Sequence, residues 1–456
     1  MPHKHHTGIR TAVSNRLADN PTNSMPLLYA HTCPNCHNSP PIRGGVGGGA
    51  VASEDLPSDY DFEQHAIEVL TDLFAGKQPS SGLLVTTGKT LAGKVQESYT
   101  QITPDFTTPD TAMLARLTSD VWQFSAAKNW QELRDLTDVL KDENGKLREW
   151  ADFKEAAESV VDKYQTNWMR SEYNFAISAS QSAARWTEFM NTKEIIPNLQ
   201  YQTVGDDAVR PEHQLLDGVI KPKTDPWWSI HYPPNGWGCR CEAIEVPNGL
   251  GRVTPDDRVP VIDIPKMFRT NLANSGLLFP KDHPYYNGIP KSELRKAIAW
   301  LNPKNTYQSV VIDDYEIDIH PLHGQKELDS NINASHALLQ HDPDAKIKLL
   351  PILNEQDEKV KSKFYPKEYL KKHPRKNADA IYNGTPIEFE VPSGSKKSIQ
   401  WAISNGKKQA DKVIIYLNDN IDFKEAVRVA NGHLKHYTND KFEVWLLNKE
   451  HFTQIK

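Results

Sequence analysis

Residues 377–394, in the C-terminal part of the chain, read NADAIYNGTPIEFEVPSG. Two short apolar runs flank a Tyr-Asn-Gly-Thr turn at 382–385, which is typical of a hairpin between antiparallel strands. Asp379, Glu388 and Glu390 accompany these runs. Side chains alternate between the faces of a strand, so the two glutamates share one face. Two interpretations follow: the acids line the wet face of a sheet edge, or they hold a divalent metal ion.

The surrounding pattern predicts a mixed α/β unit over residues 325–456. We expect its elements in the order helix, three strands, helix, strand, helix and strand, at 325–341, 346–353, 379–383, 387–391, 397–411, 412–417, 423–437 and 442–448. This αβββαβ core follows an upstream part that has a different, mainly helical pattern. The fold class is therefore a multidomain α+β protein.

The upstream part reads as a tail followed by a mainly helical domain. Residues 1–51 are rich in His, Asn and Pro and end in a Gly run, so we expect a flexible tail. Apolar spacing predicts a helix near 61–76, two helices within 111–145, and a helix of nearly forty residues over 153–190.

A β-rich segment closes that domain, which we place at 52–250. It is dense in turns and in polar residues that we expect to hold each other, with Arg210 pairing to Asp217 or Asp225. Prolines and short apolar runs then predict a linker over 251–324.

The totals restrict the class of protein. A chain of 456 residues is long enough for two or three cores. Its net charge of −6 gives no overall attraction to nucleic acid or anionic lipid, so any such binding must be local. No apolar run reaches the roughly 20 residues that a membrane span needs, and the N-terminus lacks the apolar core of a signal peptide. Four cysteines are too few for a disulfide scaffold and suit a reducing cytosol.

The cysteines leave two interpretations open. Cys33 and Cys36, flanked by His31 and His37, have the spacing of zinc ligands, and they could be joined by the later pair, Cys239 and Cys241. In the second interpretation, Cys239 and Cys241 are partly buried thiols packed under Trp237.

Residues from about 55 to 247 resemble the Mu F-like family of phage minor head, or head morphogenesis, proteins. The resemblance rests on an Arg-x-x-His element, an Asp-Gly turn, a Pro-Pro pair and a closing Cys-Arg-Cys, which here are Arg210, His213, Asp217, Gly218, Pro233, Pro234, Cys239, Arg240 and Cys241. The residues alone leave a structural role, which we favour, and a catalytic role open for this set. The resemblance implies a protein needed for head assembly, with partners among portal and capsid proteins and a place in the virion. It also implies entry into the host cytoplasm with the DNA.

The C-terminal unit resembles PD-(D/E)xK nucleases, and in particular the tRNA-cleaving domain of contact-dependent inhibition (CdiA-type) toxins. The resemblance implies that Glu327, Asp379 and Glu388 are the metal-site acids, that Asp379 and Glu388 ligate Mg²⁺, and that Gln409 is a supporting polar residue. The implied substrate is RNA, tRNA above all, and an immunity protein is an implied partner.

One position departs from that family's pattern. Glu390 stands where the family has lysine. Either Glu390 takes over the role, or Lys396 or Lys397 reaches in from the next loop, or the enzyme is weakened. Two functions remain: a nuclease effector attached to a head protein, and a purely structural assembly protein with an inert C-terminal module that binds DNA or portal.

Overall fold

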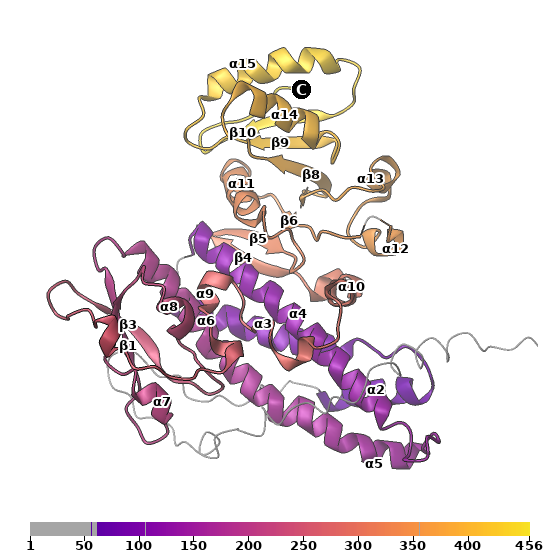
Figure 1. Ribbon diagram of the computed structural model, residues 1–456. Helices are drawn as coiled ribbons and strands as arrows, with labels where there is room; N and C mark the ends of the chain where they lie inside the picture. The colour runs from indigo at the N-terminus through magenta and orange to yellow at the C-terminus, as the bar shows by residue number, and fades with distance from the viewer. Residues whose placement is uncertain (1–55, 57–61, 105, 355) are drawn as a thin grey trace, which may run out of the picture. The chain divides into compact units, whose positions relative to one another are not determined.

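The computed structural model describes residues 56, 62–104, 106–354 and 356–456 (Figure 1). The tail predicted over residues 1–51 lies outside these ranges, as do Cys33 and Cys36 with their flanking histidines. The described chain divides into two compact units. The first contains residues up to 94, 124–182 and 188–290, and the second contains 95–123, 183–187 and 291–456.

The helices of the upstream part lie close to the predicted positions, although one helix replaces two that were expected. Its helices are α2 (Phe62–Phe74), α3 (Gly82–Ile102), α4 (Thr108–Asp138), α5 (Trp150–Val161) and α6 (Met169–Asn191). A π-helical segment, Asp162–Trp168, joins α5 to α6, so the long helix predicted over 153–190 is confirmed as one helical run. The two helices expected within 111–145 are instead the single helix α4 followed by a turn, and α3 has a weak apolar pattern that gave no prediction.

A small antiparallel sheet follows in the first unit. Its strands are β1 (Asn198–Gln202), β2 (Ile220–Pro222) and β3 (Glu242–Val246), in the order β2-β1-β3. Short helices α7 (Pro211–Gln214), α8 (Trp228–His231) and α9 (Leu272–Ser275) and single 3₁₀ turns at Asp256–Arg258, Lys266–Phe268 and Pro284–Tyr286 fill the connections. The predicted β-rich end of the helical domain is therefore present.

The first half of the predicted linker is part of the first unit. Phe279 is fully buried and its ring stacks on Phe124 of α4, with 3.7 Å between ring centroids. The Tyr285 hydroxyl donates to the Glu172 carboxylate over 2.6 Å, and Glu172 forms a buried ion pair with Lys128, also at 2.6 Å. Proline-rich segments lack helical or strand periodicity, which is why the sequence pattern did not reveal this packing.

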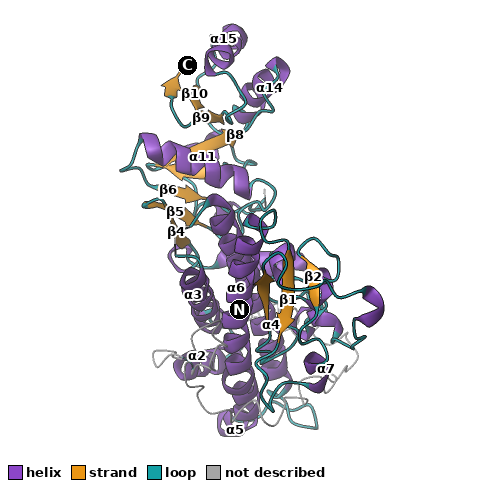
Figure 2. Cartoon of the chain, turned by 90° about the vertical axis from the view of Figure 1, so that its left-hand side faces the viewer, coloured by secondary structure: helices purple, strands orange, loops and turns teal. Residues whose placement is uncertain are grey.

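The second unit is built on an eight-stranded mixed sheet. Its strands are β4 (Gln308–Ile312), β5 (Tyr315–Ile319), β6 (Ile347–Leu349), β7 (Ala380–Tyr382), β8 (Thr385–Glu390), β9 (Lys412–Tyr416), β10 (Glu443–Leu447) and β11 (Phe452–Gln454). They lie in the order β11-β10-β9-β8-β7-β6-β5-β4, and Figure 2 shows β4, β5 and β6 as neighbours. The pairs β5–β6, β8–β9 and β9–β10 are parallel, and the other pairs are antiparallel.

The second half of the predicted linker also belongs to this unit. It contains α10 (Lys291–Trp300), the 3₁₀ turn Pro303–Asn305 and the hairpin β4–β5, which pairs with β6 and extends the sheet. The unit therefore begins near residue 291 rather than 325. Downstream the expected element order is present, with α11 (Leu328–His341), α14 (Lys396–Gly406) and α15 (Phe423–Leu434) at the predicted places. Short helices α12 (Glu358–Lys361) and α13 (Lys367–Lys372) and the turn Lys435–Tyr437 complete it.

The core of the second unit explains these positions. Helices α14 and α15 lie beside β9 and β10 (Figure 1). Their apolar side chains pack on those of the two strands, among them Ile403, Val413 and Val429. The turn that opens β8 needs two residues with positive φ, and Asn383 (φ 47°) and Gly384 (φ 84°) provide them. The hairpin register predicted from residues 377–394 follows from this turn.

Candidate functional site

Three of the predicted acids lie together where β7 meets β8. Asp379 immediately precedes β7, and Glu388 and Glu390 lie on β8. The Asp379 carboxylate accepts a hydrogen bond from the Phe389 backbone N–H, 3.0 Å from Oδ2. In turn, the Asp379 backbone N–H donates to the Glu388 carboxylate. Continuing the β7–β8 register therefore sets the Asp379 and Glu388 carboxylates side by side.

The acids of β8 are unusual because they are buried. Glu388 and Glu390 are only 7% and 8% exposed. Within the described part of the chain, Oε2 of Glu388 is a buried atom that has no hydrogen-bond partner. A buried carboxylate oxygen without a partner is costly, so the wet-edge interpretation does not fit these two residues. An orphaned carboxylate oxygen beside other acids is the donor set that a divalent cation requires.

The acids hold their protons more tightly than exposed carboxyls do. Burial raises the pKa of Asp379 to about 8, and the charge of Glu327 adds to the effect. Burial likewise raises the pKa of Glu390 to about 7. The pKa of Glu388 is well above its ordinary range, because the residue is buried and because Asp379 and Glu390 repel its charged form. A bound cation would relieve all three effects.

The start of α11 supplies the fourth acid and an orienting amide. Glu327, the residue before α11, is exposed, yet its charge raises the pKa of Asp379 and of both glutamates on β8. One turn later, Asn331 donates a hydrogen bond to Asp379. The Asn331 amide also donates to Nε2 of His323 over 3.2 Å, since Nδ1 of that histidine donates to the Leu350 carbonyl at 2.7 Å.

Asn331 and His323 were missed as site residues in the sequence. The only signal was the spacing of four between Glu327 and Asn331, which places both on one helix face. Burial lowers the pKa of His323 to about 4, so its ring is neutral and serves as an acceptor for Asn331.

Glu390 is held from the other side by α14. Asn405 donates to Glu390 Oε1 over 2.8 Å, and this contact was also missed. Next to it, Gly406 allows the helix to approach the sheet closely. A Cβ at Gly406 would lie 2.5 Å from Val413 and 3.2 Å from Cγ of Glu390. The position of Glu390 is thus fixed by a hydrogen bond and by a close backbone approach.

The two remaining predicted site residues take other positions. Lys396 is exposed at the first turn of α14. Among the ion pairs of the described residues, none joins Lys396 or Lys397 to the cluster. Gln409 contributes its backbone carbonyl, which accepts from the Tyr369 hydroxyl at 2.8 Å. The structure brings together Glu327, Asp379, Glu388 and Glu390 and leaves the lysines outside.

The carboxylates are the ligand type that a divalent metal prefers, but their oxygen atoms do not lie within coordination distance of one common point. Among the described residues, no three of them place oxygens within 4.8 Å of one another. Mg²⁺ binds through one or two carboxylates and keeps several waters, so Asp379 and Glu388 suffice as protein ligands.

In the first unit, the Arg210 side chain has a different partner from the one expected. Its guanidinium donates to the Trp237 backbone carbonyl and lies against Gly236. Trp237 itself packs edge-on against Phe175, with 4.9 Å between ring centroids. Arg210 therefore ties the loop before the Cys-Arg-Cys motif to the start of α7.

The two aspartates of this motif accept hydrogen bonds from backbone N–H groups instead of pairing with Arg210. Asp217 Oδ1 accepts from the Thr203 backbone N–H at 2.7 Å, and Asp225 Oδ1 accepts from the Trp227 backbone N–H at 2.8 Å. The expected pairing was wrong because backbone N–H groups bind both carboxylates: Asp225 bonds two residues ahead in its own turn, and Asp217 bonds the residue that follows β1.

The Cys-Arg-Cys motif divides its roles between two sides. Arg240 points outward and forms a two-pronged pair with Asp206, with both N–O distances 2.6 Å. The cysteines point inward to the same atom of His213: Cys239 Sγ lies 3.7 Å and Cys241 Sγ 3.6 Å from Nδ1. Both cysteines are free thiols.

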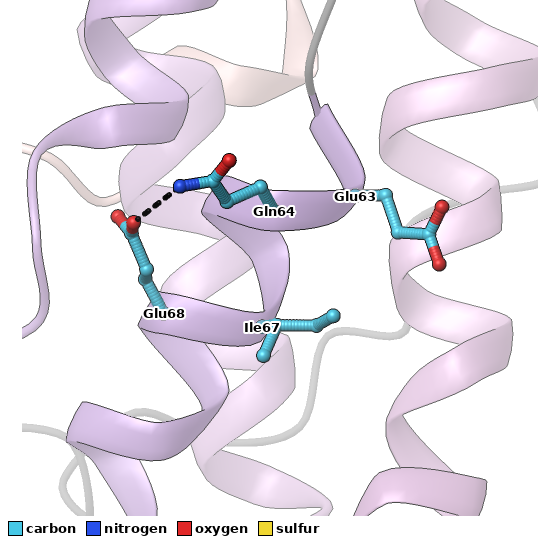
Figure 3. A pocket seen from close by; sticks show the side chains of 4 residues that line it. All are labelled: Glu63, Gln64, Ile67 and Glu68. Carbon is cyan, nitrogen blue, oxygen red and sulfur yellow. Dashed lines mark hydrogen bonds between the residues drawn. The ribbon is translucent and has the colours of Figure 1, made fainter.

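An open surface pocket lies elsewhere, along the outer face of α2. It has a volume of about 440 Å³ and is lined by Glu63, Gln64, Ile67 and Glu68, with Gln64 donating to Glu68 (Figure 3). One helix face provides all four side chains, and none of the predicted site residues is among them. We assign no function to this pocket.

The similarity of this chain to known proteins lies in part of its helical region and in the small antiparallel sheet. Residues 133–244 match the family described as Phage Mu protein F like protein. This Mu F-like region contains the Arg210 to Cys241 motif and most of the small sheet. Two curated relatives match shorter stretches.

Each relative matches only part of its length. The chain is 42% identical over 69 residues to the "Putative capsid assembly protein F" of Escherichia phage Mu, covering 15% of this chain and 16% of that protein. It is 42% identical over 59 residues to the "Mu-like prophage FluMu F protein" of Haemophilus influenzae, covering 13% and 14%. The chain thus spans about one sixth of the length of these relatives. No solved structure matches it.

In the described residues, no helix is both long and apolar enough to cross a bilayer.

Proposed function

We propose that the chain is a phage head-assembly protein whose second unit is a metal-dependent nuclease. Assembly is supported by the Mu F-like region and by the relative from phage Mu, whose printed description is that of a capsid assembly protein. Portal and capsid proteins are the partners, the virion is the location, and the second unit enters the host cytoplasm with the DNA.

The buried acid cluster is the single observation that carries the nuclease proposal. An inert module has no use for Glu388 with an orphaned oxygen beside Asp379 and Glu390, because each buried charge lowers its stability. Asp379 and Glu388 would hold Mg²⁺, and Glu327 would add negative charge at the open side. The metal would activate a water molecule and neutralise charge on a scissile phosphate.

The residues around the acids would position and transfer protons. The neutral His323 ring orients the Asn331 amide, and Asn331 in turn holds the Asp379 carboxylate in its orientation. Asn405 fixes Oε1 of Glu390, and a pKa of about 7 suits Glu390 for accepting a proton at neutral pH. In this proposal Glu390 does the work for which PD-(D/E)xK enzymes use a lysine.

Nucleic acid would approach along exposed basic residues. Arg375 and Lys376 precede β7, and Lys396 and Lys397 begin α14, all of them exposed. Lysine and arginine near a site attract the phosphate backbone locally, although the whole chain is acidic. RNA, and tRNA in particular, is the proposed substrate, and an immunity protein that covers this site is the proposed partner.

The assay for the nuclease uses the full chain with total RNA or plasmid DNA and Mg²⁺. We expect cleavage by the wild type, at least ~100-fold less with Asp379→Asn or Glu388→Gln, and wild-type cleavage with Lys266→Ala, an exposed control in the first unit. Equal cleavage by wild type and acid variants, or no cleavage under any condition, would reject the nuclease. For the assembly role, absence of the chain from purified virions and normal heads after its deletion would reject it.

The alternative is a structural protein whose second unit only binds DNA or portal. It is favoured by one observation: no lysine of the described chain forms an ion pair with the acid cluster, and Glu390 replaces the family's lysine. Binding of nucleic acid without Mg²⁺-dependent cleavage would support this alternative.

A further inference from the structure

His213, Cys239 and Cys241 form a compact cluster in the first unit, and none of them belongs to the acid cluster of the second unit. His213 lies on α7, and the cysteines lie just before β3. One ligand atom from each residue, the two Sγ atoms and a ring nitrogen, lies within 4.8 Å of the other two. His213 and Cys239 are only 3% and 4% exposed, and Cys241 is half-buried.

The distances match the edges of a coordination tetrahedron. Zinc binds thiolate sulfur at about 2.3 Å and imidazole nitrogen at about 2.0–2.1 Å. At the tetrahedral angle these bond lengths separate nitrogen from sulfur by about 3.6 Å. The observed separations of Nδ1 from the two sulfurs are 3.6 and 3.7 Å.

Hydrogen bonding alone explains this arrangement less well. Nδ1 of an imidazole carries either one proton or one lone pair, so it can serve one sulfur well but not two. Yet both sulfur atoms lie at nearly equal distances from Nδ1. Three ligand atoms facing one common point is the arrangement that a metal ion produces.

Polar groups of neighbouring residues surround the two sulfur atoms. The Asn235 backbone N–H donates to Cys239, and the positive charge of Arg210 acts on Cys241. The Tyr201 hydroxyl also hydrogen-bonds to Cys241. Such outer contacts orient the ligands of metal sites and are a regular part of them.

We propose that His213 Nδ1, Cys239 Sγ and Cys241 Sγ bind a Zn²⁺ ion, with a solvent molecule as the fourth ligand. The ion joins α7 to the segment that leads into β3. A helix of four residues has few contacts of its own, so a metal cross-link contributes directly to holding α7 against the segment that leads into β3. Arg210 holds the same two segments together through Trp237.

The test uses the full chain with Cys33→Ser and Cys36→Ser, so that Cys239 and Cys241 are its only thiols. After dialysis, elemental analysis should find equimolar zinc. Cobalt substitution should give a thiolate-to-metal charge-transfer band. Zinc should be lost with Cys239→Ser and with His213→Ala, but kept with His213→Cys, which retains a suitable ligand. The matched control His231→Ala, a half-buried histidine on α8, should keep its zinc.

Three outcomes would overturn the site. The first is a folded background protein without zinc after growth in zinc-supplemented medium. The second is full zinc content in the double variant Cys239→Ser/Cys241→Ser. The third is an intact mass lower than that of the dithiol form by two hydrogen atoms, which would mean that the cysteines have been oxidised to a disulfide. If the single variants fail to fold, removal of zinc from the background protein by a chelator must still lower its melting temperature.

Discussion

The Asp379 carboxylate lies against the backbone of Glu388 and Phe389, with its Oδ2 3.0 Å from the Phe389 nitrogen. This contact fixes one acid at the edge of β7 and turns the next acid, Glu388, toward it. Glu388 is buried and Asp379 is half-buried, and the charged forms of the two carboxyls repel each other.

Without metal, the stability of the second unit should fall as pH rises. The folded state raises the pKa of Asp379 to about 8, from about 4 in the unfolded chain, so between these values the folded state binds more protons. The free energy of unfolding therefore decreases from about pH 4 to pH 8, by at most about 1.4 kcal/mol per pH unit for this group. Denaturant titrations in EDTA check this. A profile in EDTA that rises with pH, or that is unchanged in Asp379→Asn, would contradict it.

Replacing Glu388 by glutamine should stabilise the metal-free protein at pH 8. The amide has nearly the shape of the carboxyl but no charge to desolvate and no repulsion from Asp379 and Glu390. We expect a higher melting temperature in EDTA together with loss of the response to Mg²⁺. The control is Glu316→Gln on the exposed side of β5, which should change neither.

Asn331 acts on the site only through Asp379. Asn331→Ala should weaken Mg²⁺ activation about 10–100-fold, the usual effect of losing an outer hydrogen bond to a metal ligand. The measurement is the Mg²⁺ concentration for half-maximal cleavage, compared with Asn333→Ala on the same helix. A lower maximal rate with unchanged Mg²⁺ dependence would assign Asn331 a different role.

The buried pair of Lys128 and Glu172 should matter more than any surface pair. Both side chains are almost fully buried, so Lys128→Ala leaves an uncompensated charge and should cost about 3–5 kcal/mol. Lys266→Ala, which breaks an exposed pair with Asp282, should cost almost nothing. Equal effects of the two variants in urea denaturation would refute the assignment.

The segment after residue 250 should be required for the first unit to fold. Phe279→Ala removes a buried ring that stacks on Phe124, with an expected cost of about 3–5 kcal/mol. Val261→Ala is the control in the same segment, because Val261 is 98% exposed. A truncation at residue 250 that melts like the longer chain would show that the segment is a linker after all.

The sequence predicted what periodicity and turn chemistry control. The hairpin of 377–394 follows from Asn383 and Gly384, and the acids on β8 share a face because strand side chains alternate. The element order after residue 325 was predicted for the same reason. These are local properties, readable within a few residues.

What sequence reasoning missed depends on contacts between distant segments. The β4–β5 hairpin and the packing of Phe279 lie in a proline-rich region without periodicity, and only their partners elsewhere make them part of a core. Likewise, Arg210 donates to a backbone carbonyl rather than to an aspartate, and Asn405 of α14 donates to Glu390 on β8. Side-chain partners of this kind need the fold before they can be named.

Calorimetric titration of the full chain with Mg²⁺ at pH 7, repeated in buffers of different ionisation enthalpy, tests the central claim most directly. The raised pKa values of Asp379 and Glu390 mean that a metal must displace protons. We predict binding accompanied by proton release in the wild type, with both lost in Asp379→Asn. Absence of binding, or equal binding and proton release in wild type and variant, would contradict a metal site at these acids.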